Sequence, residues 1–407
     1  MSSLKAYKYK LYPNKEQKEK LQWTLDHCRE LYNAALQERR DAWKMCQVCI
    51  SYNQQAGQLP EIKVIRLEYN DIHSQVLQDV LRRVKKAYDN FFRRVKEGQA
   101  PGYPRFQGYR RYDSFTYPQS GFSLTQDNRV CLSKIGTIKV KMHRDLEGTI
   151  KTCTIKRETN HWYVIFTCEA EQDLIYHPSE EAVGIDLGLL HFATLSDGST
   201  IENPRHLRRS EHKLKKLQEA LSRKKRGSKR RRKAAHLVGK AHRRIRNQRK
   251  DFHQKEARKL VTQYQIMVFE KLQPANMSRC PKPKQDEKTG QYLPNGANAK
   301  AGLNKSILDA GWGQFQQIVM NKAEWAGSRV LLVSPKYTSQ LCSGCGAIVH
   351  KELEERWHQC SCGCSLDRDH NAAVNILRLG MQLLAKEFQA RTEPSADAPL
   401  RSPALQG

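Results

Sequence analysis

The feature that most constrains the fold is a cluster of cysteines: five of the twelve in the chain lie between residues 342 and 364. Cys342 and Cys345 flank Ser-Gly and precede another Gly, so both thiolates can face one ion at a tight turn. After a spacer of 14 residues comes the compressed run Cys360-Ser-Cys362-Gly-Cys364. Four thiolates in this array favour one structural Zn²⁺, held by Cys342, Cys345, Cys360 and Cys362, with Cys364 as the alternative ligand.

A second pair, Cys46 and Cys49, has Cys-x-x-Cys spacing but no partner pair near it in the sequence. We interpret it as ordinary packing at a helix end, because free cysteines behave as small apolar side chains. We find neither a run of ~18 apolar residues nor an N-terminal signal pattern. The sequence therefore predicts no membrane span, and thiols that stay reduced.

Basic residues concentrate in one segment. Residues 205–250 hold 21 Lys and Arg against two Glu, a net +19 out of the chain's +29. An excess of this size favours a polyanionic partner, with nucleic acid as the best candidate. Leu214, Leu221 and Ile245 keep a helical period, and Gly227-Ser228 supplies a turn. We expect a helical hairpin with one packed face, which would form a cradle for a phosphate backbone.

Helix and strand patterns alternate in the first part of the chain. Asn14, with Gln17 three residues later, predicts the start of a helix, and a second helix is predicted over residues 71–96. Strand patterns precede these helices at 5–12 and follow them between 122 and 168. This order predicts one β-sheet or barrel interrupted by a helical insertion.

The second part of the chain contains short apolar runs typical of buried strands at 183–188, 192–195, 265–270 and 329–333. A helix predicted at 304–327 would cover such a sheet with Leu308, Trp312, Phe315, Val319 and Ala323. Residues 276–303 and 391–407 show no periodicity, which predicts a loop and a tail without regular structure.

Three acids stand at the ends of predicted elements. Asp186 ends an apolar strand, Glu270 ends another, and Asp369 precedes a helical run for which it could also serve as the N-cap. Singly, each has an ordinary structural explanation. Together, in a chain whose charge favours a polyanionic partner, the three acids could converge on one site. They could then bind two Mg²⁺ ions ~3.5–4 Å apart for phosphodiester hydrolysis, because this chemistry requires hard oxygen ligands.

Five motifs occur in one order: Val183-Gly-Ile-Asp-Leu-Gly, Phe269-Glu-Lys-Leu, Ser306-Ile-Leu-Asp-Ala-Gly-Trp-Gly-Gln-Phe315, Tyr337-Thr-Ser-Gln-Leu-Cys-Ser-Gly-Cys345-Gly and Leu366-Asp-Arg-Asp-His-Asn-Ala-Ala373. With the opening Lys-Leu-Tyr-Pro-Asn14 and the segment Gly102-Tyr-Pro-Arg-Phe106, they make nearly the whole chain resemble the TnpB family of bacterial and archaeal insertion sequences. This family was formerly labelled transposase and is understood as RNA-guided DNA endonucleases related to type V CRISPR effectors.

The resemblance implies an α+β or α/β multidomain fold. A split β-barrel wedge domain with a helical recognition insert would precede an RNase H-like (RuvC-like) nuclease domain that is interrupted by a zinc-ribbon module. The implied boundaries are 1–14 and 100–176 for the barrel, 15–99 for the insert, 181–335 and 366–388 for the nuclease domain with a basic hairpin at 205–262, 336–365 for the zinc module, and 389–407 for a disordered tail.

The resemblance also implies residue roles. Asp186, Glu270 and Asp369 fall on the catalytic acids, with Asp369 a better match than Asp367, and would bind two catalytic Mg²⁺ ions in addition to the one structural Zn²⁺. The implied partners are a guide RNA from the element's end and double-stranded target DNA. We expect a monomer in the cytoplasm, associated with the nucleoid when bound to DNA. The short flanking motif beside the target would be read by Ser74, Gln75, Gln78 and Thr116.

Contacts to phosphates are expected along the basic hairpin, from Arg223, Lys224, Arg230, Arg231, Arg232, Lys233, Arg243 and Arg244. Two other functions remain open. A DNA transposase would act on element ends with the same acids and without guide RNA. A nuclease-dead RNA-guided repressor ranks last, since all three acids are present.

Overall fold

The computed structural model describes residues 2–109, 111–171, 181–352 and 355–392. It forms two compact units, Met1–Gln172 and Asp173–Gly407. The predicted connection at His177-Pro178 lies outside the described residues. Of the tail predicted from residue 389, residues 389–392 are helical, and the remainder lies outside the described residues. Among the helices that the structure describes, none combines the length and apolar character needed to cross a membrane.

The first unit is built on a seven-stranded antiparallel sheet with the order β2-β6-β7-β1-β5-β4-β3. Its strands are β1 (Ser2–Tyr12), β2 (Ser114–Tyr117), β3 (Phe122–Thr125), β4 (Arg129–Leu132), β5 (Gly136–Lys141), β6 (Thr149–Glu158) and β7 (His161–Glu171). The first strand of the chain lies centrally because β1 pairs with β7 on one side and β5 on the other. Strand pairing in the described residues ends at β2 and β3, so closure into a barrel stays a prediction.

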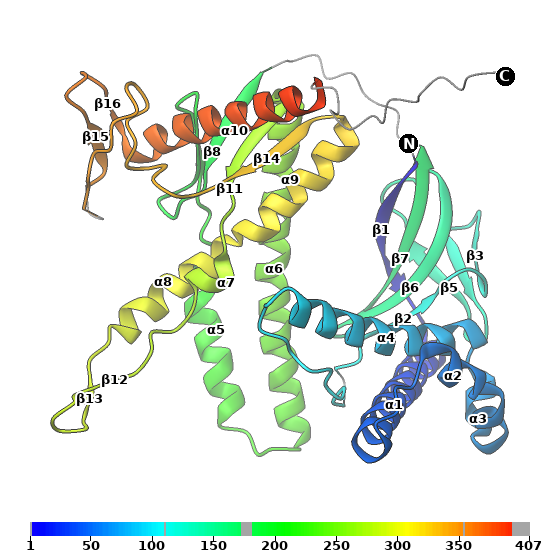
Figure 1. Cartoon of the computed structure of the whole chain (residues 1–407). Coiled ribbons are helices and arrows are strands. Elements are labelled where there is room, and N and C mark those ends of the chain that lie inside the picture. The colour runs from blue at the N-terminus through cyan, green and yellow to red at the C-terminus, as the bar shows by residue number, and fades with distance from the viewer. Residues whose placement is uncertain (1, 110, 172–180, 353–354, 393–407) are drawn as a thin grey trace, which may run out of the picture. The chain divides into compact units, whose positions relative to one another are not determined.

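The helices of this unit lie between β1 and β2 in sequence. They are α1 (Lys15–Cys46), α2 (Tyr52–Gly57), α3 (Leu59–Ile65) and α4 (Ser74–Lys96), and Figure 1 shows them together at one end of the sheet. The predicted start of α1 is confirmed, since Asn14 and Gln17 form a reciprocal capping box. One hydrophobic core, which includes Tyr9, Leu25, Leu77 and Phe166, joins the helices to the sheet.

The second unit contains a five-stranded sheet with the order β10-β9-β8-β11-β14. Its strands are β8 (Ala182–Asp186), β9 (His191–Leu195), β10 (Thr200–Glu202), β11 (Ile266–Glu270) and β14 (Arg329–Val333). Strands β8, β11 and β14 are parallel, whereas β9 runs antiparallel to β8 and to β10. The predicted strands in this part of the chain are confirmed.

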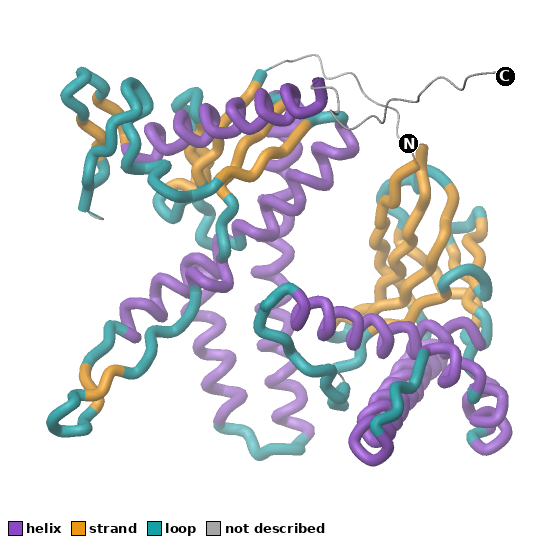
Figure 2. Tube along the Cα trace, in the orientation of Figure 1, coloured by secondary structure: helices purple, strands orange, loops and turns teal. Residues whose placement is uncertain are grey.

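Helices cover both faces of this sheet, as Figure 2 shows. Met267 and Phe269 of β11 pack into a core with α6 (Lys229–Gln263) and α9 (Trp312–Ala326). Val268, which points to the opposite face, packs with Ile376 of α10 (Arg368–Thr392). This alternation explains the continuous apolar run of β11, because a strand buried on both faces has no polar side.

The predicted basic hairpin consists of α5 (His206–Ser222) and α6. Leu214 and Ile245 are buried, but Leu237 is 49% exposed. Only part of the hairpin therefore has a packed apolar face, and its turn region presents a basic surface.

Two predictions in the following segment were wrong. The single helix predicted at 304–327 is interrupted at Gly311, whose φ of 67° lies in the left-handed region, so α8 (Ala297–Ala310) and α9 are separate helices. Leu308, predicted to face the sheet, is 58% exposed, whereas Trp312, Phe315, Val319 and Ala323 are buried. The predicted loop at 276–303 also contains regular structure: part of α7 (Pro274–Met277), β12 (Lys284–Gln285), β13 (Tyr292–Leu293) and the start of α8.

Candidate active site and zinc module

The register of two parallel strands brings the first two acids together. Ile185 of β8 is paired with Phe269 of β11. The next residues are Asp186 and Glu270, so both acids lie at the same end of neighbouring strands. Glu270 is in turn paired with Val333 of β14. The edge where parallel strands end is the usual place for a functional site in such sheets.

Two glycines let α10 bring the third acid to the same edge. A Cβ atom on Gly184 would lie 2.0 Å from the carbonyl oxygen of Ala373, and one on Gly380 would lie 2.4 Å from Val268 Cγ2. The helix therefore packs with its backbone against β8, a close approach that only glycine permits. Asp369, in the first turn of α10, is thereby brought near the end of β8. Its Oδ2 lies 3.9 Å from the position that a Cβ atom on Gly188 would occupy.

Asp367, rather than Asp369, caps α10. Its Oδ1 accepts hydrogen bonds from the backbone N–H groups of Asp369 at 2.8 Å and His370 at 3.2 Å. The expectation that Asp369 could serve as the N-cap was wrong. Its carboxylate instead lies 3.5 Å from Arg368 Nε and 3.9 Å from Arg356 Nη1. The capping role of Asp367 leaves Asp369 as the acid that faces the strand ends.

Burial raises the pKa of two of the acids, and neighbouring negative charges add to this effect at Asp186. Burial, reinforced by repulsion from Glu270 and Asp369, raises the pKa of Asp186 well above its usual range. Burial also raises the pKa of Glu270, and the Thr338 hydroxyl, which donates a hydrogen bond to it, partly offsets this increase. A bound cation would relieve both the desolvation and the repulsion.

The arrangement of the carboxylates is open. Among the described residues, the groups of three or more whose ligand atoms all lie within 4.8 Å of one another are cysteine-containing, and the acids Asp186, Glu270 and Asp369 do not form such a group. Mg²⁺ is usually held by one or two carboxylates together with substrate phosphates and water, rather than by a complete protein cage. The open set of hard oxygen ligands fits Mg²⁺ of that kind.

A buried hydrogen-bond network links Glu270 to the cysteine module. Asn375, which is fully buried, donates to the carbonyl oxygens of Thr338 at 3.0 Å and Leu341 at 2.7 Å. Asn371, one turn earlier on α10 and also buried, donates to Leu341 O at 2.8 Å and accepts from the Ser343 N–H at 2.9 Å. Residues 338–343 are therefore fastened to α10 at both ends.

Sequence reasoning missed the roles of Thr338 and Asn375. Thr338 lies in the quoted motif before Cys342, and its hydroxyl reaches Glu270 only through tertiary structure. The signal for the asparagines was visible: Asn371 and Asn375 are polar residues one turn apart among Ala372, Ala373 and Ile376 on a buried helix face. Buried amides in such a place require hydrogen-bond partners.

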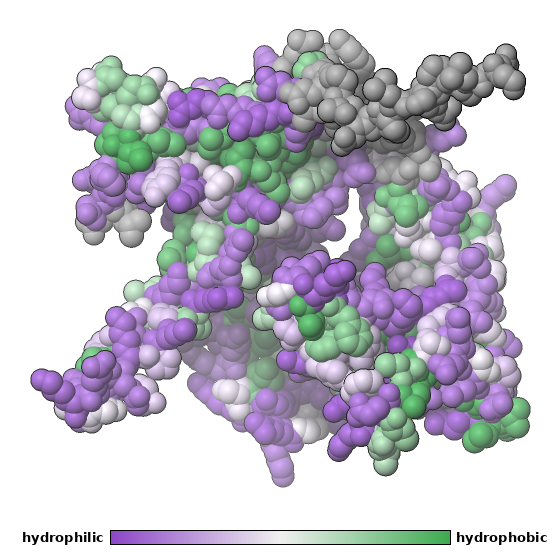
Figure 3. All heavy atoms as spheres, viewed as in Figure 1, coloured by the Kyte–Doolittle hydropathy of each residue, from purple (hydrophilic) through white to green (hydrophobic). Residues whose placement is uncertain are grey.

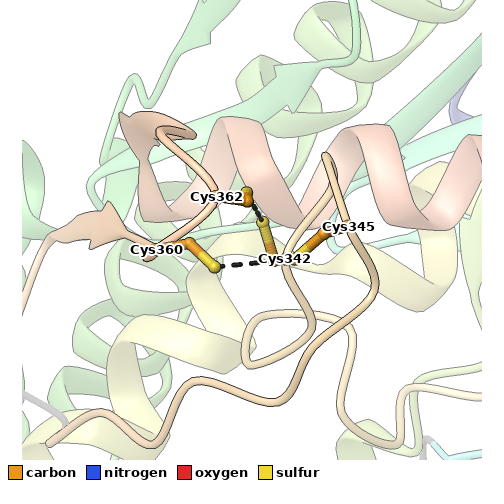
Figure 4. A group of neighbouring side chains, drawn as sticks. All are labelled: Cys342, Cys345, Cys360 and Cys362. Atoms are coloured by element: carbon orange, nitrogen blue, oxygen red, sulfur yellow. Dashed lines mark hydrogen bonds between the residues drawn. The ribbon is translucent and has the colours of Figure 1, made fainter.

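The structure gathers the four cysteines that the sequence favoured for zinc. Cys342 Sγ lies 3.6 Å from Cys362 Sγ, and Cys345 Sγ lies 3.6 Å from Cys360 Sγ, as Figure 4 shows. Zn–S bonds of about 2.3 Å in a tetrahedron place sulfur atoms about 3.8 Å apart, so the group has the size required for this ion. The cysteines come from the turn after residue 341 and from the turn between β15 (Trp357–Gln359) and β16 (Ser365–Asp367).

The environment of Cys342 favours a thiolate. Burial alone would raise its pKa, but hydrogen bonds from the backbone of Cys345 and Gly344 and from His358 outweigh this effect and bring the pKa to about 5. Cys364, the alternative ligand, belongs to a second candidate group that consists of Cys342, His358 and Cys364. Both groups share Cys342, so one ion is the most that can use it without bridging.

The predicted phosphate contacts of the hairpin fall into two kinds. Arg223, Lys224, Arg230, Arg232, Lys233 and Arg244 are exposed. Arg231 and Arg243 are partly buried. Arg231 Nη1 donates to the carbonyl oxygens of Leu221 at 2.9 Å and Lys224 at 3.0 Å, so it satisfies the C-terminal end of α5. Arg231 thus has a structural role in the turn that the charge pattern did not reveal.

The residues predicted to read a flanking motif lie at the start of α4 and on β2. Gln75 Oε1 accepts from the Ser120 N–H at 3.0 Å, and Ser74 Oγ accepts from Lys63 Nζ at 2.7 Å. Thr116 Oγ1 lies 2.9 Å from Arg83 Nη2 and from Thr154 Oγ1, so its hydroxyl is engaged within the unit. Gln78 is partly buried on the next turn of α4.

Partly buried acids at the end of a mixed sheet, on a unit that also carries a strongly basic hairpin, are typical of an enzyme that acts on a polyanion. Three family models match the chain: one described as "Probable transposase" at residues 165–280, one as "Cas12f1-like, TNB domain" at 312–376, and one as "Helix-turn-helix domain" at 1–47. In the described part of 1–47 the structure contains one strand and one helix, β1 and α1.

Curated relatives extend this similarity over the chain. InsQ of Escherichia coli (strain K12), named as an RNA-guided DNA endonuclease, is 34% identical over 95% of this chain and 94% of its own length. A protein of Streptomyces pristinaespiralis with the same designation is 33% identical over 93% of this chain and 89% of its own length. TnpB-like protein L770 of Acanthamoeba polyphaga mimivirus is 28% identical over 60% of this chain and 46% of its own. The chain belongs to the TnpB family of RNA-guided DNA endonucleases.

Solved structures give weaker matches. A Cas12f1–guide RNA–target DNA complex has 13% identity and a TM-score of 0.33 over 92% of this chain and 99% of that chain. A mini RNA-guided endonuclease, CRISPR-Cas phi3, has 10% identity and a TM-score of 0.37 over 93% of this chain and 92% of that chain. Superpositions at these scores do not define the fold of this protein.

Proposed function

We propose that the protein is an RNA-guided DNA endonuclease that cuts target DNA with two Mg²⁺ ions held by Asp186, Glu270 and Asp369. The observation that carries this proposal is the placement of Asp186 and Glu270 at the same end of neighbouring parallel strands, with Asp369 brought to that edge by the close packing of α10. Family membership supports the substrate and the guide. Bound Mg²⁺ would supply an activated water and stabilise the leaving 3′ oxygen of the phosphodiester.

Each of the three acids would have its own role in binding Mg²⁺. Asp186 would hold Mg²⁺ in its ionised form, because a cation would offset the burial and the negative charges of Glu270 and Asp369 that raise its pKa. Glu270 would direct one oxygen to a metal while the other accepts from Thr338. Asp369 would complete the set from α10, whose start is fixed by Asp367.

The remaining parts would bind and position nucleic acid. The exposed cations of the α5–α6 hairpin would hold RNA or heteroduplex through phosphates, so that base pairing supplies the sequence choice. Ser74, Gln75, Gln78 and Thr116 would lie near a short flanking motif. One Zn²⁺ on Cys342, Cys345, Cys360 and Cys362 would be structural, because four protein ligands leave no position open to substrate.

Family membership also supports the predicted division of the chain. Residues 1–14 and 100–176 would form the wedge domain around an insert at 15–99, a reading that the pairing of β1 with β7 supports. Residues 181–335 and 366–388 would form an RNase H-like nuclease domain, supported by the mixed sheet with β9 antiparallel to β8. The zinc module at 336–365 would interrupt it. The complex would contain one copy of the chain.

The decisive experiment compares wild-type protein, purified with its RNA, with Asp186→Ala. We expect wild-type protein to cut a DNA that matches the RNA only when Mg²⁺ is present. The variant should lose cleavage by about 10³-fold or more, as removal of a catalytic group commonly does, but keep its RNA and DNA binding. Cleavage by Asp186→Ala at the wild-type rate would refute the assignment. Strand joining that survives complete removal of RNA would favour a transposase, and absence of cleavage by wild-type protein with retained RNA-guided binding would favour a repressor.

A further inference from the structure

A group of aromatic side chains lies exposed at the C-terminal end of α4. Phe92 is 60% exposed, Tyr103 is 44% exposed and Phe106 is 43% exposed. Figure 3 shows an apolar patch at this end of α4, at the place where Figure 1 shows the helix passing into the following loop. We define the aromatic platform as Tyr88, Phe91, Phe92, Tyr103 and Phe106.

The rings are held in place by one another. The centroid of the Phe91 ring lies 5.2 Å from that of Phe92 and 5.3 Å from that of Tyr103. The hydroxyls of Tyr88 and Tyr103 lie 3.1 Å apart and share a hydrogen bond. Rings in such mutual contact lose little conformational freedom when a ligand arrives, since their rotamers are already fixed.

The segment that carries Tyr103 and Phe106 is anchored to α1. The Asn33 side chain donates to the Gln107 carbonyl at 3.0 Å and accepts from the Gln107 N–H at 2.8 Å. Pro104, between the two aromatic residues, is buried. Tyr103 and Phe106 are therefore exposed on a segment that is itself fixed, which is unlike a loop whose apolar residues are exposed only because it moves.

Cations border the platform. The Arg40 guanidinium lies 5.8 Å from the ring centre of Tyr103 and 5.1 Å from that of Phe106, and Arg39 lies 5.6 Å from that of Tyr88. Exposed Arg94 and Arg105 add further positive charge. The nearby acids are paired: Glu97 with Arg93 at 2.9 Å and Asp89 with Lys85 at 2.7 Å. An apolar ligand that is also anionic suits this surface.

We propose that the aromatic platform stacks unpaired bases of the guide RNA, a role that rests on the proposed function. A nucleic acid strand combines flat π faces with phosphates, which match exposed rings bordered by arginines. Single-stranded RNA is commonly recognised by stacking on aromatic side chains and guanidinium planes. We assign the platform to RNA rather than DNA because, in the proposed function, the guide is bound before any target DNA arrives and is therefore the strand available to these exposed rings.

Ultraviolet cross-linking of the full-length protein, as isolated with its RNA and without DNA, tests the occupant. We expect RNA adducts on tryptic peptides that contain Phe92, Tyr103 or Phe106. Adducts on these peptides that form only after target DNA is added, and that carry DNA, would assign the platform to a DNA strand and overturn the proposal. Absence of adducts there, with adducts elsewhere on the protein, would also overturn it.

Substitutions at the two exposed phenylalanines test stacking itself. Phe92→Ala and Phe106→Ala should each weaken binding of a 12-nucleotide oligouridine to RNA-stripped protein by about tenfold, measured by fluorescence anisotropy. Phe92→Tyr should stay close to wild type, whereas Phe92→Leu, which remains apolar but cannot stack, should resemble Phe92→Ala. The salt dependence of binding should not change, because no phosphate contact is removed.

Ile65→Ala provides the matched control, since Ile65 is 80% exposed on the same unit and lies outside the platform. It should bind oligouridine as wild type does. Equal binding by Phe92→Leu and wild type would overturn stacking. If Phe92→Ala converts an RNA-free dimer to a monomer in light scattering, the surface contacts a second copy instead. Failure of the proposed function is recognised separately, because wild-type protein would then bind no RNA.

Discussion

The two groups of candidate metal ligands in this protein differ in how complete they are. The sulfur atoms of Cys342, Cys345, Cys360 and Cys362 all lie within 4.8 Å of one another, as a closed tetrahedral site requires. The carboxylates of Asp186, Glu270 and Asp369 do not form such a group, although burial, reinforced by the charges of Glu270 and Asp369, raises the pKa of Asp186. A closed metal site holds its own segment of the chain in one fold. An open set of carboxylates leaves positions on the metal for water and a phosphate.

The two sites are nevertheless connected. Residues 338–343 carry Thr338 toward Glu270 and lead directly into the Cys342 turn. Asn371 and Asn375 hold that segment on α10, the helix that also carries Asp369. We infer that the closed site keeps the open one in shape, and the predictions below test this relation.

The largest effect is expected when the closed site is removed. Cys342→Ser with Cys345→Ser should abolish zinc binding, which in structural zinc peptides has an apparent free energy of about 10–16 kcal/mol. The module should lose its fold, and cleavage should fall with it because Thr338 is released. Zinc content by mass spectrometry and cleavage rate are the measurements.

The control uses the pair with identical spacing. Cys46 and Cys49 are both exposed at and after the end of α1, so the packing predicted for them was wrong. Cys46→Ser with Cys49→Ser should therefore keep one zinc per chain and wild-type cleavage. Full cleavage by the zinc-free protein would break the connection between the sites.

An intermediate effect is expected at the connection itself. Thr338→Val keeps the shape of the side chain but removes the hydrogen bond to Glu270, a bond to a charged group worth about 1.5–3 kcal/mol. Cleavage should fall roughly 10- to 100-fold, with zinc content unchanged. Because the lost bond favours the ionised carboxylate, the pKa of Glu270 should rise further and the acid limb of the pH–rate profile should move to higher pH.

Thr338→Ser restores a hydroxyl and should recover most of the rate and the wild-type pH profile. A uniform loss of rate without a displaced acid limb in Thr338→Val would mean that the residue acts through packing alone. RNA binding, measured in parallel, should be the same for both variants.

Local signals predicted the elements of both sites better than their geometry. The Asn14 capping box and the apolar run of β11 depend on neighbouring residues, and both were visible in the sequence. The approach of α10 to β8 depends on Gly184 meeting Ala373 far along the chain, a contact that no local pattern encodes. The interruption at Gly311 was missed because the apolar period continues across it, while the left-handed backbone rotates the preceding helix and exposes Leu308.

The difference between local signals and long-range contacts also explains which parts of the candidate site could be predicted. Strand ends predicted where Asp186 and Glu270 would lie, because parallel strands in register carry their last residues to one edge. The choice between Asp367 and Asp369 came from resemblance, and its physical basis is a hydrogen bond from the Asp369 N–H to Asp367. In a sequence, an acid that caps a helix looks the same as a neighbouring acid that faces the strand ends, and the two differ only in where each carboxylate points.

The smallest effect concerns stability rather than activity. The raised pKa of Asp186 means that the folded protein binds its proton more tightly than the unfolded chain does, so metal-free wild-type protein should lose stability as pH rises above about 4. Asp186→Asn removes this ionisation. Its melting temperature without metal should exceed that of wild type, by about 2–4 °C for each kcal/mol of relieved repulsion and desolvation.

The difference in melting temperature should be small near pH 4 and increase toward pH 8, since the wild-type carboxylate is forced to ionise only at higher pH. Added Mg²⁺ should stabilise wild-type protein and leave Asp186→Asn almost unchanged, which reduces or reverses the difference. The closed cysteine site should show the opposite behaviour, because removing its ligands destabilises the chain at every pH at which zinc is bound. A melting temperature for Asp186→Asn below that of wild type in EDTA at pH 8 would mean that the ionised Asp186 carboxylate does not destabilise the metal-free protein. The proposed difference between the carboxylate group and the cysteine group would then be wrong.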